Sequence, residues 1–224
     1  MTEYDKPATL PGRRGRPSAD DIRDRMAALL VVARREFGRI GYRNATMANI
    51  ARAAGLTKRT LYLWHENKAT LFRACILEGV SRFPKIDADS GDAPSVVLER
   101  FLADLIDELA RDDASSMGRL LVREGAEFPE LGPVAERSHN DFIIAPLSAY
   151  LRSHKLEREE SVEMSELLVS MALAPVHNGL LLGRAMPSPS QARDHARFVV
   201  TFFMARVPDR PAMVGAHSND HVTG

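Results

Sequence analysis

Residues 45–62 carry the sequence ATMANIARAAGLTKRTLY, which predicts two short helices joined by a tight turn. Thr46 and Thr57 are of the residue type that caps a helix N-terminus, and each precedes a short run of helix-forming residues. Gly55 stands where the first helix has to close, and glycine adopts the left-handed conformation that such an ending uses. The stretch therefore predicts a helix-turn-helix over about residues 46–65.

The second of these helices begins with the basic pair Lys58 and Arg59. A helix of this kind fits the DNA major groove, where an arginine can donate two hydrogen bonds to guanine and a lysine can reach a base or a phosphate. Thr57 and Thr60 add hydroxyls near the helix N-terminus, which favours phosphate oxygens. Lys68, at the start of the next helix, is a candidate phosphate clamp.

The same helix carries alternating aromatic and aliphatic residues. We expect Leu61 and Leu63 to lie in its inward region, with Tyr62 and Trp64 flanking them at groove-facing positions. Their OH and indole NH groups would then be available to DNA, although both rings could instead be core aromatics.

The charge distribution supports a DNA-binding N-terminal half. Residues 1–85 hold 17 Lys+Arg against 8 Asp+Glu, whereas residues 86–224 hold 13 against 22, so the net charge of zero hides +9 and −9. A basic segment of this kind is expected of a phosphate-binding module. The alternative is unevenly distributed solvated charge.

Residues 1–19 are predicted to form a flexible basic arm containing Arg13, Arg14 and Arg16. Arginines in such an arm can follow the DNA minor groove, where the potential is negative. A solvated basic tail with only general attraction for DNA is the competing interpretation.

Apolar residues recur at helical spacing throughout the remaining chain, so the predicted fold class is all-α. We expect an N-terminal three-helix helix-turn-helix DNA-binding domain at 20–84 and a helical ligand-binding and dimerisation domain at 85–207. Residues 208–224 are expected to form a disordered tail.

The helix-turn-helix stretch resembles the DNA-binding region of the TetR/AcrR family of transcriptional regulators, over about residues 22–82. The positions that match the family spacing are Phe37, Gly41, Tyr42, Thr46, Ile50, Ala51, Ala54, Gly55, Thr60, Leu61, Tyr62 and Lys68. The resemblance implies that Lys58, Arg59 and Tyr62 face bases. It also implies that the DNA backbone is contacted by Thr46, Thr57, Thr60, Trp64 and Lys68.

Two positions depart from the family pattern. Trp64 stands where His or Tyr is usual, which keeps a donor but changes its reach. His65 replaces an apolar Phe, and its ring is expected to pack on the helical core rather than contact DNA.

The C-terminal half resembles, more weakly, the AefR-like regulatory domains of some family members. The family implies a homodimer that binds a pseudo-palindromic double-stranded operator, and a repressor that is released by a small-molecule ligand. We expect the apolar helices at about 161–184 and 190–206 to form the dimer interface. Residues at such positions are more often core or salt-bridge residues than ligand contacts. The candidate ligand contacts are Phe101, Arg119, Arg123, Phe128, His139, Phe142, Met171, His177 and Asn178.

Other features favour a non-enzymatic cytoplasmic protein. Cys75 is the only cysteine, so neither an internal disulfide nor a Cys-x-x-Cys metal site is expected. His139 and His177 lack metal-ligand spacing, and no cofactor motif, signal peptide or membrane segment is expected.

Two other classes compete with a regulator. An enzyme with a DNA-binding head would need an acidic metal cluster or an activated nucleophile, and the acids at 112–113 and 157–160 are interpreted as solvated charge. A helical interaction module unconnected with DNA would leave the basic half unexplained, and salt-dependent binding to duplex DNA would separate it from a regulator.

Overall fold

The computed structural model describes residues 19–156 and 162–205, and these form two compact units. The first unit consists of the described residues up to Ser81 together with Asp112–Glu136, and the second of Arg82–Arg111 with the described residues from Arg137 onward. Across the described ranges the secondary structure is helical, without a strand, which confirms the predicted all-α class.

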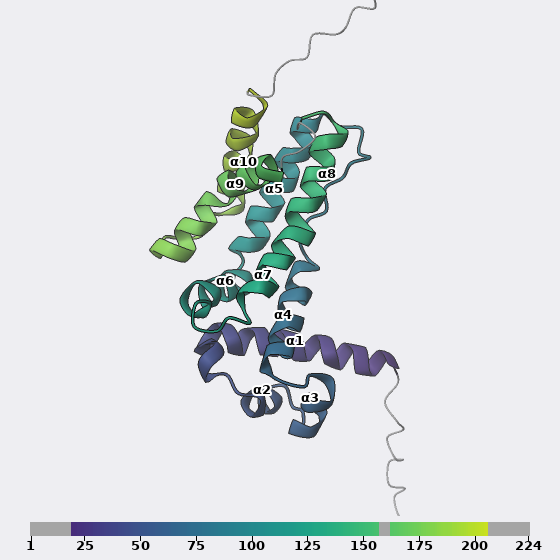
Figure 1. Cartoon of the computed structure of the whole chain (residues 1–224), viewed down its shortest axis with the longest axis vertical. Coiled ribbons are helices and arrows are strands. Elements are labelled where there is room, and N and C mark those ends of the chain that lie inside the picture. Colours follow the sequence, from purple (N-terminus) through teal and green to yellow (C-terminus); the bar gives the residue numbers. More distant parts are fainter. Residues whose placement is uncertain (1–18, 157–161, 206–224) are drawn as a thin grey trace, which may run out of the picture. The chain divides into compact units, whose positions relative to one another are not determined.

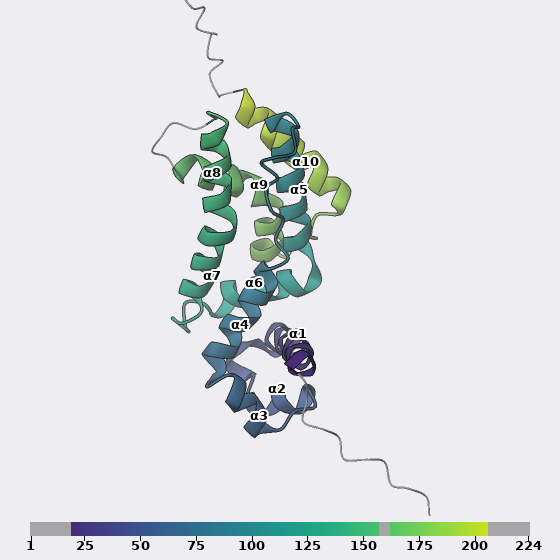
Figure 2. The same ribbon diagram turned by 90° about the vertical axis from the view of Figure 1, so that its right-hand side faces the viewer.

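The first unit contains the helix-turn-helix. Its helices are α1 (Ala19–Asn44), α2 (Met47–Ala53), α3 (Lys58–Trp64), α4 (Lys68–Val80) and α6 (Asp112–Glu124). Helices α4 and α6 pack against α1, and α2 packs against α3 (Figure 1; Figure 2). Phe37 is buried in this core, where its ring contacts Tyr42 and Phe72.

Helix α1 is interrupted at Gly41, which has φ 83° and ψ 163°. Gly41 therefore ends the regular part of the first helix. Beyond it, Tyr42 is buried and Ala45 leads directly into Thr46, the N-cap of α2. The break thus sets the direction in which the chain enters the helix-turn-helix.

The first unit also includes residues 112–136, which lie beyond the domain boundary expected at residue 84. Met117, Leu120 and Leu131 of the segment 112–136 are buried in the same core cluster as Phe37 and Leu61. The division between the units falls inside α7 (Gly132–His139). The sequence suggested one boundary between two continuous domains, because the order of elements does not reveal that α6 packs on α1.

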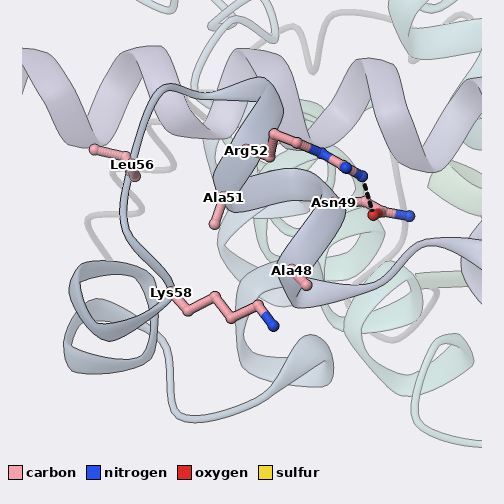
Figure 3. A pocket seen from close by; sticks show the side chains of 6 residues that line it. All are labelled: Ala48, Asn49, Ala51, Arg52, Leu56 and Lys58. Atoms are coloured by element: carbon pink, nitrogen blue, oxygen red, sulfur yellow. Dashed lines mark hydrogen bonds between the residues drawn. The ribbon is translucent and has the colours of Figure 1, made fainter.

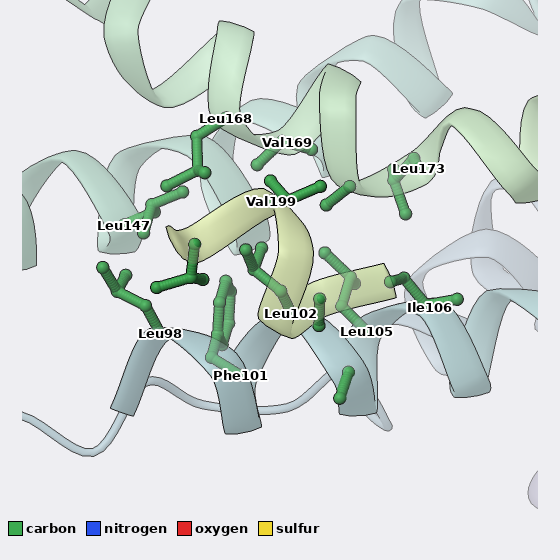
Figure 4. Close-up of a cluster of buried hydrophobic side chains, with 14 of the residues drawn as sticks. Leu98, Phe101, Leu102, Leu105, Ile106, Leu147, Leu168, Val169, Leu173 and Val199 are labelled. Atoms are coloured by element: carbon green, nitrogen blue, oxygen red, sulfur yellow. The ribbon is translucent and has the colours of Figure 1, made fainter. Parts of the chain in front are cut away.

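The second unit is built from α5 (Pro94–Ala110), η1 (Asn140–Ile144), α8 (Ala145–Ser153), α9 (Val162–Leu182) and α10 (Pro189–Met204). Figure 4 shows side chains of α5, α8, α9 and α10 converging on one apolar core. Leu98, Phe101 and Leu105 of α5 contribute to it, with Leu147 from α8 and Leu173 from α9.

The helical segment before Pro146 widens locally and does not break. Residues Asn140–Ile144 form a π-helix, in which the N–H of Ala145 donates to the carbonyl of Asn140, and α8 follows at once. Proline has no N–H and clashes with the preceding turn, so it fits at the start of a new helix. The wider turn accommodates Pro146 with little loss of helix.

One helix within the described ranges is long and apolar enough to cross a membrane by length and composition alone. It is Glu163–Leu182 in α9, with mean hydropathy 1.3 and 39% of the window buried. Its side chains Leu168, Val169 and Leu173 belong to the core of the second unit. No membrane segment was expected, because the sequence has no uninterrupted apolar run of about 18 residues. This helix instead qualifies by its mean hydropathy over a window of 18 residues.

Candidate DNA-binding interface

The two threonine caps and the glycine turn predicted from the sequence are confirmed. The hydroxyl of Thr46 accepts the N–H of Asn49 at 3.1 Å, and that of Thr57 accepts the N–H of Thr60 at 3.1 Å. Gly55 has φ 66°, a conformation that glycine adopts without steric cost. Together these residues fix where α2 ends and where α3 begins.

Helix α3 presents a basic and aromatic surface. Leu61 is fully buried, while Lys58, Arg59 and Tyr62 are exposed. With about 100° between successive residues, Arg59 lies nearly opposite Leu61 on the helix. The three residues expected to face bases therefore lie on the accessible side of α3.

Leu63 does not lie where it was expected. Its side chain is 81% exposed, so the prediction of an inward Leu63 beside Leu61 is wrong. Two residues correspond to about 200° around a helix, which turns Leu63 away from the core that Leu61 fills. Alternation along the sequence misleads here because its period of two belongs to strands.

Thr57 and Thr60 share a hydrogen bond between their hydroxyls at 2.8 Å. Either hydroxyl can be the donor, so one hydroxyl hydrogen of the pair remains to donate to another group. Both residues lie at the first turn of α3, as expected of candidates for phosphate contact.

A hollow of about 500 Å³ is lined by α2, the turn and the start of α3, and Figure 3 shows its side chains. Its lining residues are Ala48, Asn49, Ala51, Arg52, Leu56 and Lys58. Arg52 donates to the side-chain oxygen of Asn49 at 2.5 Å. Arg52 was not among the contacts predicted from the sequence, although its spacing of three residues from Asn49 predicts that the two side chains meet on one helix face.

Lys68 is held against the end of α1. Its ammonium donates to the carbonyl of Tyr42 at 2.7 Å and lies 4.3 Å from the centre of the Tyr42 ring. Burial lowers the pKa of Lys68, an effect opposed by the nearby carboxylates of Glu130 and Glu124. Lys68 thus has a structural contact in addition to any contact with phosphate.

Trp64 and His65, the two departures from the family pattern, are both half-buried. Trp64 packs against the core of the first unit. Burial lowers the pKa of His65, which favours the neutral ring. His65 is the C-cap of α3, where its N–H donates to the carbonyl of Leu61. Arg13, Arg14 and Arg16 lie outside the described residues.

The candidate ligand contacts fall in both units. Arg119, Arg123 and Phe128 belong to the first unit, where Phe128 packs edge-on against Tyr42 at 5.0 Å. The remaining candidates belong to the second unit: Phe101, His139, Phe142, Met171, His177 and Asn178. Within the second unit, His139 lies close enough to Glu166 and His177 to interact electrostatically with both.

Within the described ranges, no group of three or more His, Cys, Asp or Glu side chains is arranged to hold a metal ion.

Comparisons with known proteins agree with this geometry. The model of the family described as bacterial regulatory proteins, tetR family, matches residues 29–75, which extend from α1 into α4. The HTH-type transcriptional repressor BepR of Brucella suis biovar 1 (strain 1330) is 27% identical over 132 residues. The match covers 56% of this chain and only 61% of the length of BepR.

Solved structures with the same fold cover more of the chain. A TetR transcriptional regulator from Agrobacterium tumefaciens is 26% identical, with a TM-score of 0.65 over 81% of this chain and 93% of that protein. A candidate TetR-family regulator from Mesorhizobium loti MAFF303099 is 21% identical, with a TM-score of 0.69 over 82% and 96% of the two chains. Residues 29–75 therefore resemble the tetR family of bacterial regulatory proteins, and the chain shares the fold of TetR-family regulators.

Proposed function

We propose that this protein is a sequence-specific DNA-binding transcriptional regulator that acts as a dimeric repressor and is released from its operator by a small-molecule ligand. The observation that carries the proposal is the surface of α3, on which Lys58, Arg59 and Tyr62 are exposed while Leu61 is buried. BepR is named as a repressor, which supports repression rather than activation.

Arg59 and Lys58 are the proposed base-reading cations. An arginine donates two parallel hydrogen bonds to O6 and N7 of guanine, and each such pair contributes about 1–3 kcal/mol of discrimination. Tyr62 is the proposed third base contact. The proposed backbone contacts are Thr46, Thr57, Thr60, Trp64 and Lys68, with Arg13, Arg14 and Arg16 following the minor groove.

A dimer is proposed through α9 and α10. These helices expose several large apolar side chains, among them Leu167 at 54%, Leu181 at 63% and Phe198 at 67%. Large exposed apolar surfaces favour association with another protein surface. A two-fold dimer would present two α3 helices to half-sites about 34 Å apart, or a multiple of that, in a pseudo-palindromic operator.

The effector is proposed to bind in the second unit, where His139, Met171 and His177 are the candidate contacts. A ligand that favours one arrangement of the dimer would reduce operator affinity through a coupling of about 1–3 kcal/mol. We place the protein in the cytoplasm, without catalytic activity, and assign the segment 85–207 to effector binding and dimerisation.

DNase footprinting of the region upstream of the protein's own gene tests this proposal. At moderate salt, the purified protein should protect a pseudo-palindromic site of two half-sites. Thermal-shift screening of small molecules would then identify effectors by the stabilisation that ligand binding confers. If no site is protected there and random-sequence duplexes are not enriched by the protein, the proposed function is wrong.

A further inference from the structure

Leu63 is the most exposed large hydrophobic side chain among the described residues, at 81%. It lies in α3, a helix whose sequence KRTLYLW contains no acidic residue. Its neighbour of the same type, Leu61, supplies the buried anchor of that helix. The exposed leucine therefore adds nothing to the core and needs a different explanation.

The position of Leu63 on the helix is defined by its distance from Arg59. Residues four apart lie about 40° apart around an α-helix and on the same face. Relative to Leu61, Arg59 and Leu63 lie at about 160° and 200°, so together they form the outermost stripe of α3. Tyr62, which is 51% exposed, flanks that stripe.

We propose that Leu63 is a specificity-determining residue that reads the C5-methyl group of a thymine in the major groove. The proposal rests on the proposed function, because it requires that α3 enters DNA. In the major groove the thymine methyl is an apolar feature of a base pair, and it is recognised by apolar side chains. Leu63 would thus select a base that its neighbouring cations do not distinguish.

Charge favours DNA over a protein as the partner of this face. Arg59 lies next to Leu63 on α3 and Lys58 is exposed on the same helix, so an approaching phosphate backbone is attracted to α3. A single exposed leucine among basic and aromatic residues is also smaller than the contiguous apolar patches that mark protein interfaces.

The dimensions of the helix place the thymine near the guanine contacted by Arg59. Four residues rise about 6 Å along a helix, and bases of one strand are spaced by about 3.4 Å. The thymine should therefore lie one or two base steps from that guanine. An α-helix with its side chains is about 10–12 Å in diameter, which the groove width of about 12 Å accommodates.

The experiment compares thymine with deoxyuracil, which lacks only the methyl group. Duplexes that bind the full-length protein are first selected from a random library. Each thymine of one half-site is then replaced in turn, and affinities are measured by fluorescence anisotropy for wild type, Leu63→Ala and Leu77→Ala. Leu77 is a 42% exposed leucine of α4 and serves as the matched control.

One thymine near the guanine should account for about a fourfold loss of wild-type affinity on replacement, as expected for one buried methyl-sized group. The Leu63→Ala variant should bind the thymine and deoxyuracil duplexes equally well, whereas Leu77→Ala should retain the fourfold difference.

Two results would overturn the assignment. One is a wild-type protein that is insensitive to every replacement, and the other is a Leu63→Ala variant that keeps the full methyl effect. If that effect is instead lost in Tyr62→Ala, Tyr62 and not Leu63 reads the methyl. Failure of the wild type to enrich any duplex is a different outcome, which rejects the proposed function itself.

Discussion

The carboxylate of Glu124 accepts the backbone N–H of Arg43 at 2.9 Å, at the point where Gly41 breaks α1. Burial alone would raise the pKa of Glu124, but hydrogen bonds from the Arg43 amide and the Arg123 side chain outweigh burial and hold the pKa below its usual range. The break in α1 thus frees backbone donors for a carboxylate from α6. This contact fixes the segment that leads into α2 and α3.

Replacing Gly41 with alanine should be strongly destabilising. An alanine Cβ would clash with Oε1 of Glu124, and the φ of 83° with ψ of 163° is a conformation that non-glycine residues rarely adopt. The expected loss of stability is more than about 2 kcal/mol. It can be measured by urea unfolding followed through the fluorescence of Trp64, the chain's one tryptophan.

Gly55→Ala is the matched control for Gly41→Ala. Gly55 also has a positive φ of 66°, but nothing lies within 4 Å of the added Cβ. Its loss should be limited to the backbone strain of about 1 kcal/mol. Equal losses for the two variants would show that the contact with Glu124 contributes nothing.

Removing the guanidinium of Arg34 should destabilise the first unit. Arg34 of α1 is only 6% exposed and pairs with Glu78 of α4 at 2.6 Å and with Asp113 of α6 at 2.9 Å. Arg34→Ala leaves two partly buried carboxylates facing each other, with an expected cost of about 3 kcal/mol. The same unfolding measurement detects it.

Arg39→Ala provides the comparison for Arg34→Ala, since Arg39 is on the same helix but 62% exposed, and pairs with Glu36 at 2.9 Å. Exposed pairs contribute little because water and salt screen them, so this variant should unfold nearly as the wild type does. A large loss for Arg39→Ala, or none for Arg34→Ala, would refute the role assigned to the buried pairs.

Stability should fall on acidification below about pH 6.5, partly through His139. Burial lowers the pKa of His139, with His177 acting in the same direction and Glu166 against it. A histidine whose folded pKa is lowered contributes stability that is present above its unfolded value, about 6.5, and is lost as the pH falls through the folded pKa. His139→Asn should therefore show a smaller decrease in melting temperature between pH 7.5 and 5.5 than the wild type.

His65 provides a second test of this pH effect. Burial lowers the pKa of His65 as well, so the double variant His65→Asn/His139→Asn should flatten the pH profile further. If the double variant lost as much stability on acidification as the wild type, neither histidine would be responsible.

Introducing a charge at Phe198 should dissociate the proposed dimer. Phe198 of α10 is 67% exposed, and a glutamate there would be buried without a partner in an α9–α10 interface. Light scattering coupled to size exclusion should give twice the monomer mass for the wild type and the monomer mass for Phe198→Glu. Val122→Glu, at a 52% exposed position of α6, should remain dimeric. A Phe198→Glu dimer would exclude this face as the interface.

The sequence predicted the local features of the DNA-binding head because they depend on single residue types. Thr46 and Thr57 cap their helices, and Gly41 and Gly55 adopt positive φ values, since hydroxyl acceptors and glycines act over a few residues. Long-range packing was less accessible. The burial of Leu131 beside the N-terminal helices depends on contacts that local patterns do not encode.

The candidate site likewise combines features that the local sequence predicts with contacts between distant residues that it does not predict. Arg59 was expected to contact DNA because it stands at the start of the second helix, and in the structure it is exposed while Leu61 is buried. Leu63 was placed wrongly, because its hydrophobicity was given more weight than its angle on the helix. The contact of Lys68 with the Tyr42 carbonyl joins residues 26 positions apart, and no periodic pattern predicts it.

The proposed function depends most directly on whether α3 discriminates between DNA sequences through Arg59. Fluorescence anisotropy should compare wild type and Arg59→Ala on a selected duplex and on a scrambled duplex of the same composition, over a range of salt concentrations. Wild type should prefer the selected duplex by about a thousandfold or more, and its affinity should fall as salt is raised. Arg59→Ala should lose about 1–3 kcal/mol on the selected duplex and much less on the scrambled one. Equal wild-type affinity for the two duplexes, or equal losses on both in the variant, would contradict the account.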